Sequence, residues 1–170
     1  MKILRILTVS ILFTHVSDLA KAQNGAPYEV LRVLAIQMNP KFPVLDSLYP
    51  FHSTDFNGAA WAILSKDEKR ELKKRTKQSF GVKISSDSLT GTTLIPALPV
   101  FMAFAKADSP SLRFIEQTQP FYMISAPVFI HNNTKAVVFL SLIKRFGTTY
   151  ILQKKDRKWT ILKDIYEWMQ

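Results

Sequence analysis

The alternation of apolar and polar residues is most regular in the last fifty residues, 121–170. Three polar breaks, at 131–134, 144–147 and 154–157, separate four segments rich in β-branched and aromatic residues. Segments of this composition, joined by short polar connections, are typical of antiparallel strands and tight turns. The pattern therefore predicts an antiparallel β-meander of four to five strands.

Individual residues predict where these strands lie in the sheet. Pro127 has no N–H to donate, so the segment 122–130 is expected at an edge or with a bulge at Pro127. Residues 136–143 are nearly all apolar, which predicts a central strand covered on both faces. The segment 158–168 begins as a strand, and its last residues fit either a strand or a last helical turn. Trp159 follows a tight turn and opens this strand, so its ring is expected to be buried, with Ile161 on the same face.

Helical periodicity is confined to the N-terminal half. Residues 27–39 carry an apolar stripe at helical spacing, with Pro27 suited to the first turn, and Asn39-Pro40 is expected to end the helix. The stripe consists of Val30, Leu31, Val33, Leu34, Ile36 and Met38. Residues 41–50 read as an irregular connection, and 55–64 predict a short helix packed on the sheet.

The sequence Ser65-Lys66-Asp67-Glu68 matches a capping box, in which a hydroxyl and a carboxylate exchange hydrogen bonds with each other's backbone N–H groups. It predicts a helix from Lys66 to about Phe80, with Gly81 as the C-terminal cap. The apolar face of this helix is essentially Leu72, so most of it is expected to lie in water.

Between this helix and the meander, 82–85 predicts a short strand and 86–93 a polar linker. Pro99 suits the first turn of a helix over 99–107, although a strand over 100–105 fits the same residues. Residues 111–118 predict one more strand. The fold class is therefore α+β, with N-terminal helices packed on the C-terminal meander.

The first 22 residues have the pattern of a signal peptide. Lys2 and Arg5 precede an apolar run over 6–16, and Ala20-Lys21-Ala22 provides a small-x-small cleavage pattern. Cleavage after Ala22 would leave Gln23 first, and residues 23–170 as a single α+β domain in the periplasm or outside the cell. The run is too short to span a membrane, and the mature chain has no such segment.

The amino-acid composition excludes several classes of functional site. The chain contains no Cys, which excludes thiol catalysis, thiolate metal sites and disulfides, so the core alone must hold the domain. Only two histidines, His52 and His131, follow the predicted cleavage site, and carboxylates are scattered through turns, so we expect neither a metal site nor a cofactor. The sequence contains no catalytic constellation, which favours binding over enzymatic activity.

The charge balance points to anionic partners. The mature chain would keep 20 basic and 12 acidic residues, and a surplus of this size in an exported protein favours an anionic envelope component over nucleic acid. The helix after Ser65 is the most basic segment. Its candidate anion-binding residues are Lys66, Lys69, Arg70, Lys73, Lys74 and Lys77. The competing interpretation is a solvated helix face with an internal Glu71–Arg75 ion pair.

Three aromatic residues, Trp61, Tyr150 and Trp159, are candidates to line a ligand pocket, although aromatic residues in a cysteine-free domain are first of all core residues. His52 lies near Asp55 but beside no nucleophile. His131 lies in a predicted hairpin turn, where turn chemistry accounts for it.

A resemblance rests on the meander. The residues that carry it are Ile124-Ser125-Ala126-Pro127-Val128-Phe129, Ala136-Val137-Val138, Gly147-x-x-Tyr150-x-Leu152-x-Lys154 and Lys158-Trp159-x-Ile161. They resemble the C-terminal part of uncharacterised small exported proteins of Bacteroidetes-type bacteria, and the closing hairpin is similar to nuclear-transport-factor-like (cystatin-like) domains. The resemblance implies no catalytic residue here. Arg157 stands where those families favour Gly, so we expect a turn type without a left-handed residue there.

Two functional hypotheses follow. The first is a non-enzymatic exported domain that binds a partner or ligand. The second, implied by the nuclear-transport-factor-like resemblance, is a cone whose sheet and helices enclose a pocket for a small ligand or a hydrolytic activity. A space filled by core side chains would support the first, and a deep pocket with convergent polar groups the second.

Overall fold

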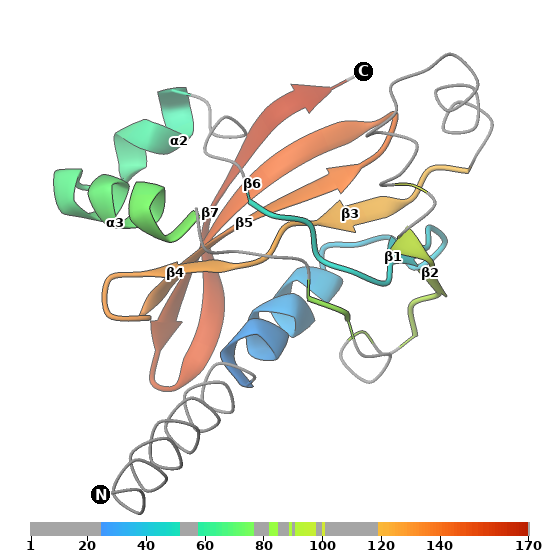
Figure 1. Ribbon diagram of the computed structural model, residues 1–170, viewed down its shortest axis with the longest axis horizontal. Coiled ribbons are helices and arrows are strands. Elements are labelled where there is room, and N and C mark those ends of the chain that lie inside the picture. The colour runs from blue at the N-terminus through green and yellow to red at the C-terminus, as the bar shows by residue number, and fades with distance from the viewer. Residues whose placement is uncertain are drawn as a thin grey trace, which may run out of the picture.

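The computed structural model describes residues 25–51, 58–76, 82–84, 89, 91–97, 100 and 119–169. The predicted signal peptide, the 111–118 strand and His52 lie outside these residues, as does all but residue 100 of the 99–107 helix. The described part contains helices packed on one mixed sheet, so the α+β class is confirmed (Figure 1).

Seven strands form this sheet, more than the four to five predicted. They are β1 (Val44–Leu45), β2 (Leu94–Ile95), β3 (Tyr122–Ile124), β4 (Val128–Ile130), β5 (Lys135–Leu142), β6 (Phe146–Lys155) and β7 (Lys158–Met169). The strand order is β2-β1-β3-β5-β6-β7, with β4 also paired to β5. The meander is antiparallel as predicted, whereas β1 pairs in parallel with both β2 and β3.

Two of the additional strands are two-residue segments, β1 within the predicted connection 41–50 and β2 just after the predicted linker 86–93. Val44–Leu45 was expected to be irregular, but it is buried between β2 and β3. Two residues carry no readable alternation, so only the neighbouring strands make this segment a strand. The expected strand at 82–85 appears in the described residues as one isolated bridge between Lys83 and Ser47.

Pro127 divides the first meander segment into β3 and β4, which pair with the two ends of β5. In the break, the Ser125 N–H donates to the Phe139 carbonyl (2.9 Å), and Ser125 Oγ accepts from the Phe139 N–H (2.8 Å). The expectation of an interruption at Pro127 is confirmed. An edge position is wrong for β3, because β1 lies on its other side.

Strand β5 is central and buried, as predicted, because its alternate side chains enter two cores. Ala136, Val138 and Leu140 face the helix over residues 25–35, while Val137 and Phe139 face the opposite core. This arrangement explains why β5 reads as a continuous apolar run.

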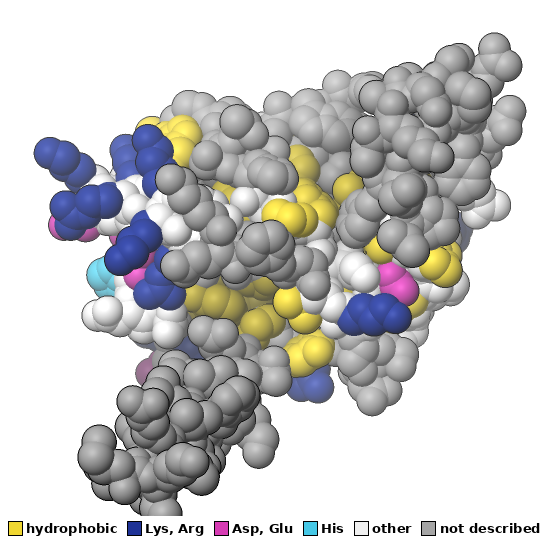
Figure 2. All heavy atoms as spheres, in the orientation of Figure 1, with side chains coloured by type: hydrophobic (Ala, Val, Ile, Leu, Met, Phe, Trp, Pro, Cys, Tyr) yellow, Lys and Arg dark blue, Asp and Glu magenta, His cyan; other side chains and the backbone are white. Residues whose placement is uncertain are grey.

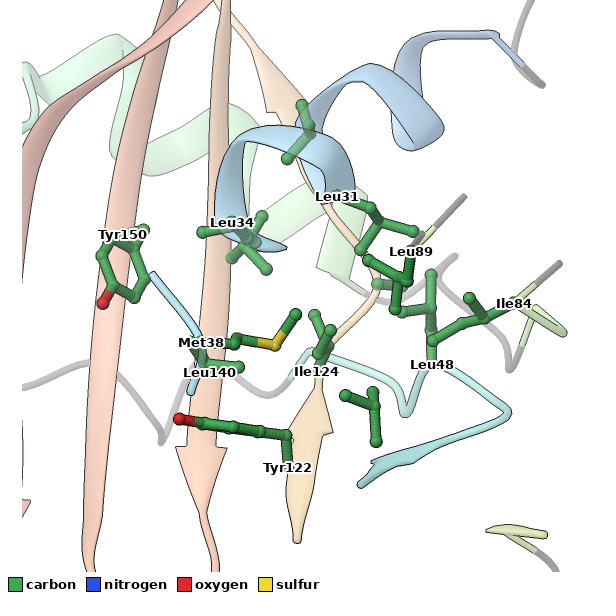
Figure 3. Packing of buried hydrophobic residues seen from close by; sticks show 14 of the residues in the cluster. Leu31, Leu34, Met38, Leu48, Ile84, Leu89, Tyr122, Ile124, Leu140 and Tyr150 are labelled. Carbon is green, nitrogen blue, oxygen red and sulfur yellow. The ribbon is translucent and has the colours of Figure 1, made fainter. Parts of the chain in front are cut away.

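The helix over 25–35 covers the larger core. Figure 3 shows its Leu31 and Leu34 beside Met38, Ile124 and Leu140. The helix ends at Ala35, earlier than the expected residue 39, so Ile36 is 81% exposed and does not belong to the buried stripe.

Helices α2 (Gly58–Ile63) and α3 (Lys66–Thr76) cover the other face of the sheet. Leu64 and Leu72 are buried there against Val128 and Ile130 of β4. The helices therefore lie on both faces of the sheet, and β1 precedes α2, so the helices do not form one N-terminal block.

Candidate functional site

Helix α3 begins with the predicted capping box. The Ser65 N–H donates to Glu68 Oε2 (2.9 Å), and the Glu68 N–H donates to Ser65 Oγ (3.2 Å). Asp67 and Glu68 lie in the first turn, and Lys73, Lys74 and Arg75 lie near the C-terminal end. Both placements complement the helix dipole, so the local sequence alone favours a helix here.

Two of the three acidic residues of α3, Glu68 and Glu71, together with Leu72, attach it to the β4–β5 hairpin. Lys135 Nζ donates to Glu68 Oε1 (2.6 Å), and the side chain of Glu68 is only 7% exposed. Glu71 Oε2 accepts from the His131 backbone N–H (2.8 Å). These contacts direct Glu68 and Glu71 toward the sheet, and most of the basic side chains are left on the outer face of the helix.

Opposing effects act on Glu68. Burial would raise its pKa, but the hydrogen bonds from Lys135 and Ser65 and the charge of Lys135 together hold the pKa below its usual range. Glu68 is therefore ionised at neutral pH, and its charge is balanced within the structure. The basic residues on the other face of α3 have no such buried partner among the described residues.

The structure places the candidate anion-binding residues as follows. Four of them, Lys66, Arg70, Lys73 and Lys74, are exposed, Lys69 is half-buried, and Lys77 lies outside the described residues. In Figure 2 Lys and Arg side chains gather at the end of the molecule where α3 lies, with a histidine beside them. Among the described residues no sequence-distant carboxylate pairs with these exposed bases, so their excess of positive charge remains available to an external anion.

Three contacts organise the basic face. Arg70 Nη2 lies 3.1 Å from Asp67 Oδ1, and both side chains are more than 80% exposed. The expected Glu71–Arg75 pair is confirmed at 2.6 Å, and Arg75 Nη1 also donates to Asn133 Oδ1 of the hairpin (2.9 Å). Exposed pairs of this kind contribute little stability, about 0–1 kcal/mol each.

The three aromatic pocket candidates do not come together. Tyr150 and Trp159 are buried in the core under the helix at 25–35, whereas Trp61 packs on the opposite face of the sheet. Lys73 Nζ lies 5.4 Å from the centroid of the Trp61 ring, so Trp61 belongs to the basic surface instead.

Trp159 closes the core beside the β6–β7 hairpin. It is 6% exposed, its ring centroid lies 5.7 Å from that of Phe129, and its Nε1–H donates to Glu29 Oε2 (3.0 Å). Hydrogen bonds from Lys154 and Trp159 lower the pKa of Glu29, although desolvation opposes them. The predicted burial of Trp159, with Ile161 packed against the same core, is confirmed.

Tyr150 has the largest pKa shift among the titratable groups of the described residues. Burial, and to a lesser extent Tyr166, Asp164 and Tyr122, raises the pKa of its phenol to about 12. The side chain stays protonated at neutral pH, which is the state of an ordinary core tyrosine.

His131 lies in the β4–β5 turn, as expected, with a positive φ of 53°, and Asn132 and Asn133 also have positive φ, 53° and 60°. Its Nδ1 lies 3.6 Å from Glu68 Oε1. Among the described residues no group of three His, Cys, Asp or Glu side chains could hold a metal ion. In the same residues no helix is long and apolar enough to cross a membrane.

The sequence interpretation of the last turn was wrong. Asp156 and Arg157 both have positive φ, 50° and 64°, which is the signature of a two-residue type I′ hairpin. Arg157 therefore occupies a left-handed position that usually takes Gly. Sequence reasoning attached no function to the basic residues around this turn. Their signal was a run of four bases around one acid, Lys154-Lys155-Asp156-Arg157-Lys158.

Comparisons with protein-family models, with curated proteins and with solved structures found no match.

Proposed function

We propose that this chain is an exported, non-enzymatic domain that binds an anionic component of the cell envelope through the basic face of α3. The observation that carries the proposal is the division of charge on this helix. Glu68 and Glu71 are bonded to the β4–β5 hairpin, while Lys66, Lys73 and Lys74 are exposed. Because both glutamates are directed to the hairpin, the exposed face of α3 carries a net positive charge, and its one exposed acid, Asp67, pairs with Arg70.

The packing beneath the helix at 25–35 supports this binding hypothesis over the pocket hypothesis. Eighteen buried side chains, among them Tyr150 and Trp159, fill the space between that helix and the sheet. The pocket hypothesis requires convergent polar groups in this space. The resemblance of the closing hairpin to nuclear-transport-factor-like domains is thus better explained by similar packing of a helix on a sheet than by a shared activity.

Binding assays on a charge-reduced protein test the proposal. The triple variant Lys66→Gln, Lys69→Gln and Lys74→Gln removes three bases from α3. Against vesicles rich in anionic lipid and against an immobilised anionic polysaccharide, affinity for at least one should fall by on the order of 100-fold, since each base beside an anionic surface contributes about 1 kcal/mol. The loss should shrink as salt is added.

A matched control removes the same charge elsewhere. Lys41, Lys83 and Lys163 are exposed and lie outside α3, so their replacement by Gln should leave most of the affinity intact. Equal binding by the two triple variants would show that only net charge matters, and the site on α3 would be abandoned.

Export is tested separately. The pattern in residues 1–22 predicts that secretion yields a chain beginning at Gln23. N-terminal sequencing of the secreted protein should find Gln23, and a soluble cytoplasmic product that retains Met1 would contradict export.

A further inference from the structure

The β6–β7 hairpin tip, defined here as residues 154–158, lies at the same end of the sheet as α3. The Lys154 N–H donates to the Thr134 carbonyl (2.7 Å), which joins the tip to the β4–β5 turn on which α3 is docked. Figure 1 shows α3, the β4–β5 turn and the β6–β7 turn in succession along this end. Two basic segments about eighty residues apart in sequence are thus parts of one end of the molecule.

The faces of the hairpin tip follow from its register. Lys154 pairs with Trp159, whose ring lies in the core under the helix at 25–35. Side chains alternate along a strand, so the next pair, Lys155 and Lys158, is directed to the opposite face, which α3 covers. Both lysines and Arg157 are exposed.

Two features of the tip oppose stability. Lys155 and Lys158 stand directly opposite each other, and like charges in a cross-strand pair repel. Arg157 has a φ of 64°, a conformation that an L side chain adopts at a cost and that Gly adopts freely. No ion pair joins these three bases to a carboxylate in the part of the chain that the structure describes.

Locally destabilising residues and strained backbone conformations of this kind are concentrated at functional sites in proteins. A hairpin selected for stability alone would have Gly at position 157 and a neutral or opposite-charge pair at 155 and 158. An anion held at the tip would remove the repulsion between the two lysines, and binding thus explains the choice of residues.

Apolar side chains beside α3 indicate which kind of anion fits. Ile63 at the end of α2 is 40% exposed, and it precedes Lys66 by three residues. Half-buried Trp61 carries Lys73 over its ring. Basic side chains beside an exposed aliphatic group and a half-buried aromatic ring fit a surface that lies in the interface of an anionic membrane.

We infer that the β6–β7 hairpin tip and α3 form one surface that docks on an anionic lipid bilayer, with Lys155, Arg157 and Lys158 binding lipid phosphates and Ile63 entering the interface. This inference rests on the proposed function, since it adds a second contact and a lipid partner to the α3 surface.

The decisive variant is Arg157→Gly. It removes one charge from the proposed surface and at the same time relieves the left-handed conformation, so a loss of binding cannot be due to unfolding. Binding to vesicles of phosphatidylglycerol and phosphatidylcholine should fall about fivefold, the equivalent of about 1 kcal/mol, while the melting temperature rises. The double variant Lys155→Gln and Lys158→Gln should lose on the order of 25-fold by the same rule.

Lys144→Gly is the matched control. Lys144 also has a positive φ, of 67°, but it lies in the β5–β6 turn at the other end of the ten-residue strand β6. That end is about 30 Å from the tip at the usual rise of a strand. Vesicle binding by Lys144→Gly should equal that of the wild type.

The outcomes are separable when all variants are expressed from the full-length sequence and purified after any processing by the cell. Loss of vesicle binding in the tip variants and the α3 variant, but not in the Lys144→Gly control, supports the inference. Loss in the α3 variant alone overturns the role of the tip and leaves the proposed function standing, and loss in neither overturns both. Ile63→Ser distinguishes a lipid partner from another polyanion. Weaker vesicle binding with unchanged binding to heparin supports a lipid surface, whereas equal effects on vesicle binding and heparin binding overturn the lipid partner.

Discussion

Trp159→Ala is the sharpest test of how this domain is held together. The side chain is 6% exposed and packs against Phe129, with Lys154 Nζ 5.6 Å from its ring centroid. Emptying a buried tryptophan site typically costs about 3–5 kcal/mol. The lost hydrogen bond to Glu29 adds little, because that carboxylate is half exposed and keeps Lys154 at 3.0 Å.

This loss is a large share of the roughly 5–15 kcal/mol that stabilises a typical domain. No disulfide compensates for it, since the chain has no cysteine. A domain of this size loses about 2–4 °C of melting temperature per kcal/mol, so we expect a decrease on the order of 10 °C.

Urea unfolding followed by far-UV circular dichroism measures the effect without relying on tryptophan fluorescence. Two controls bracket it. Trp159→Phe keeps most of the buried apolar volume and should cost only about 1 kcal/mol, because a smaller part of the site is emptied. Tyr166→Ala truncates another aromatic residue of β7, but Tyr166 is 62% exposed, so its cost should stay near 0.5 kcal/mol. A Trp159→Ala protein as stable as the Tyr166→Ala protein would refute the core role of Trp159.

Three further predictions concern single groups. The pKa of Glu68 is lowered, so its ionised carboxylate stabilises the fold above the pKa of the unfolded chain, near 4.5, and this stabilisation is lost as the pH falls through the lower folded value. Glu68→Gln should therefore cost about 1–3 kcal/mol at pH 7 and much less in acid. Urea unfolding at both pH values measures this difference. The pKa of Tyr150 is raised to about 12, so stability should fall as pH rises from about 10 to about 12, and Tyr150→Phe should abolish this part of the fall. Arg157→Gly should raise stability by about 1–2 kcal/mol in thermal unfolding, and an unchanged or lower melting temperature would contradict the left-handed conformation.

Local patterns were sufficient for elements whose partners are near in sequence. The capping box at Ser65 located the start of α3, because the groups that make it lie within one helical turn. Hairpin spacing located β5, β6 and β7 for the same reason, since each strand pairs with the next along the chain. Burial of Trp159 followed from its position just after a tight turn.

Turn geometry was less predictable. The families that the meander resembles favour Gly at position 157, which led to the expectation of a different turn, yet the strand register between Lys155 and Lys158 imposes a two-residue loop. Such a loop forces Arg157 to a positive φ whatever its propensity. Tertiary pairing can thus override a local preference worth about 1–2 kcal/mol.

The sequence by itself determined the α+β class, the antiparallel meander and the basic character of α3, because these depend on periodicity and on contacts close in the chain. Only the tertiary structure decided that Val44–Leu45 is a strand between β2 and β3, and that Trp61 lies across the sheet from Tyr150 and Trp159. It also placed the β6–β7 hairpin tip beside the turn that holds α3. Each of these depends on contacts between residues far apart in sequence, and neither alternation nor propensity encodes which distant segments will meet.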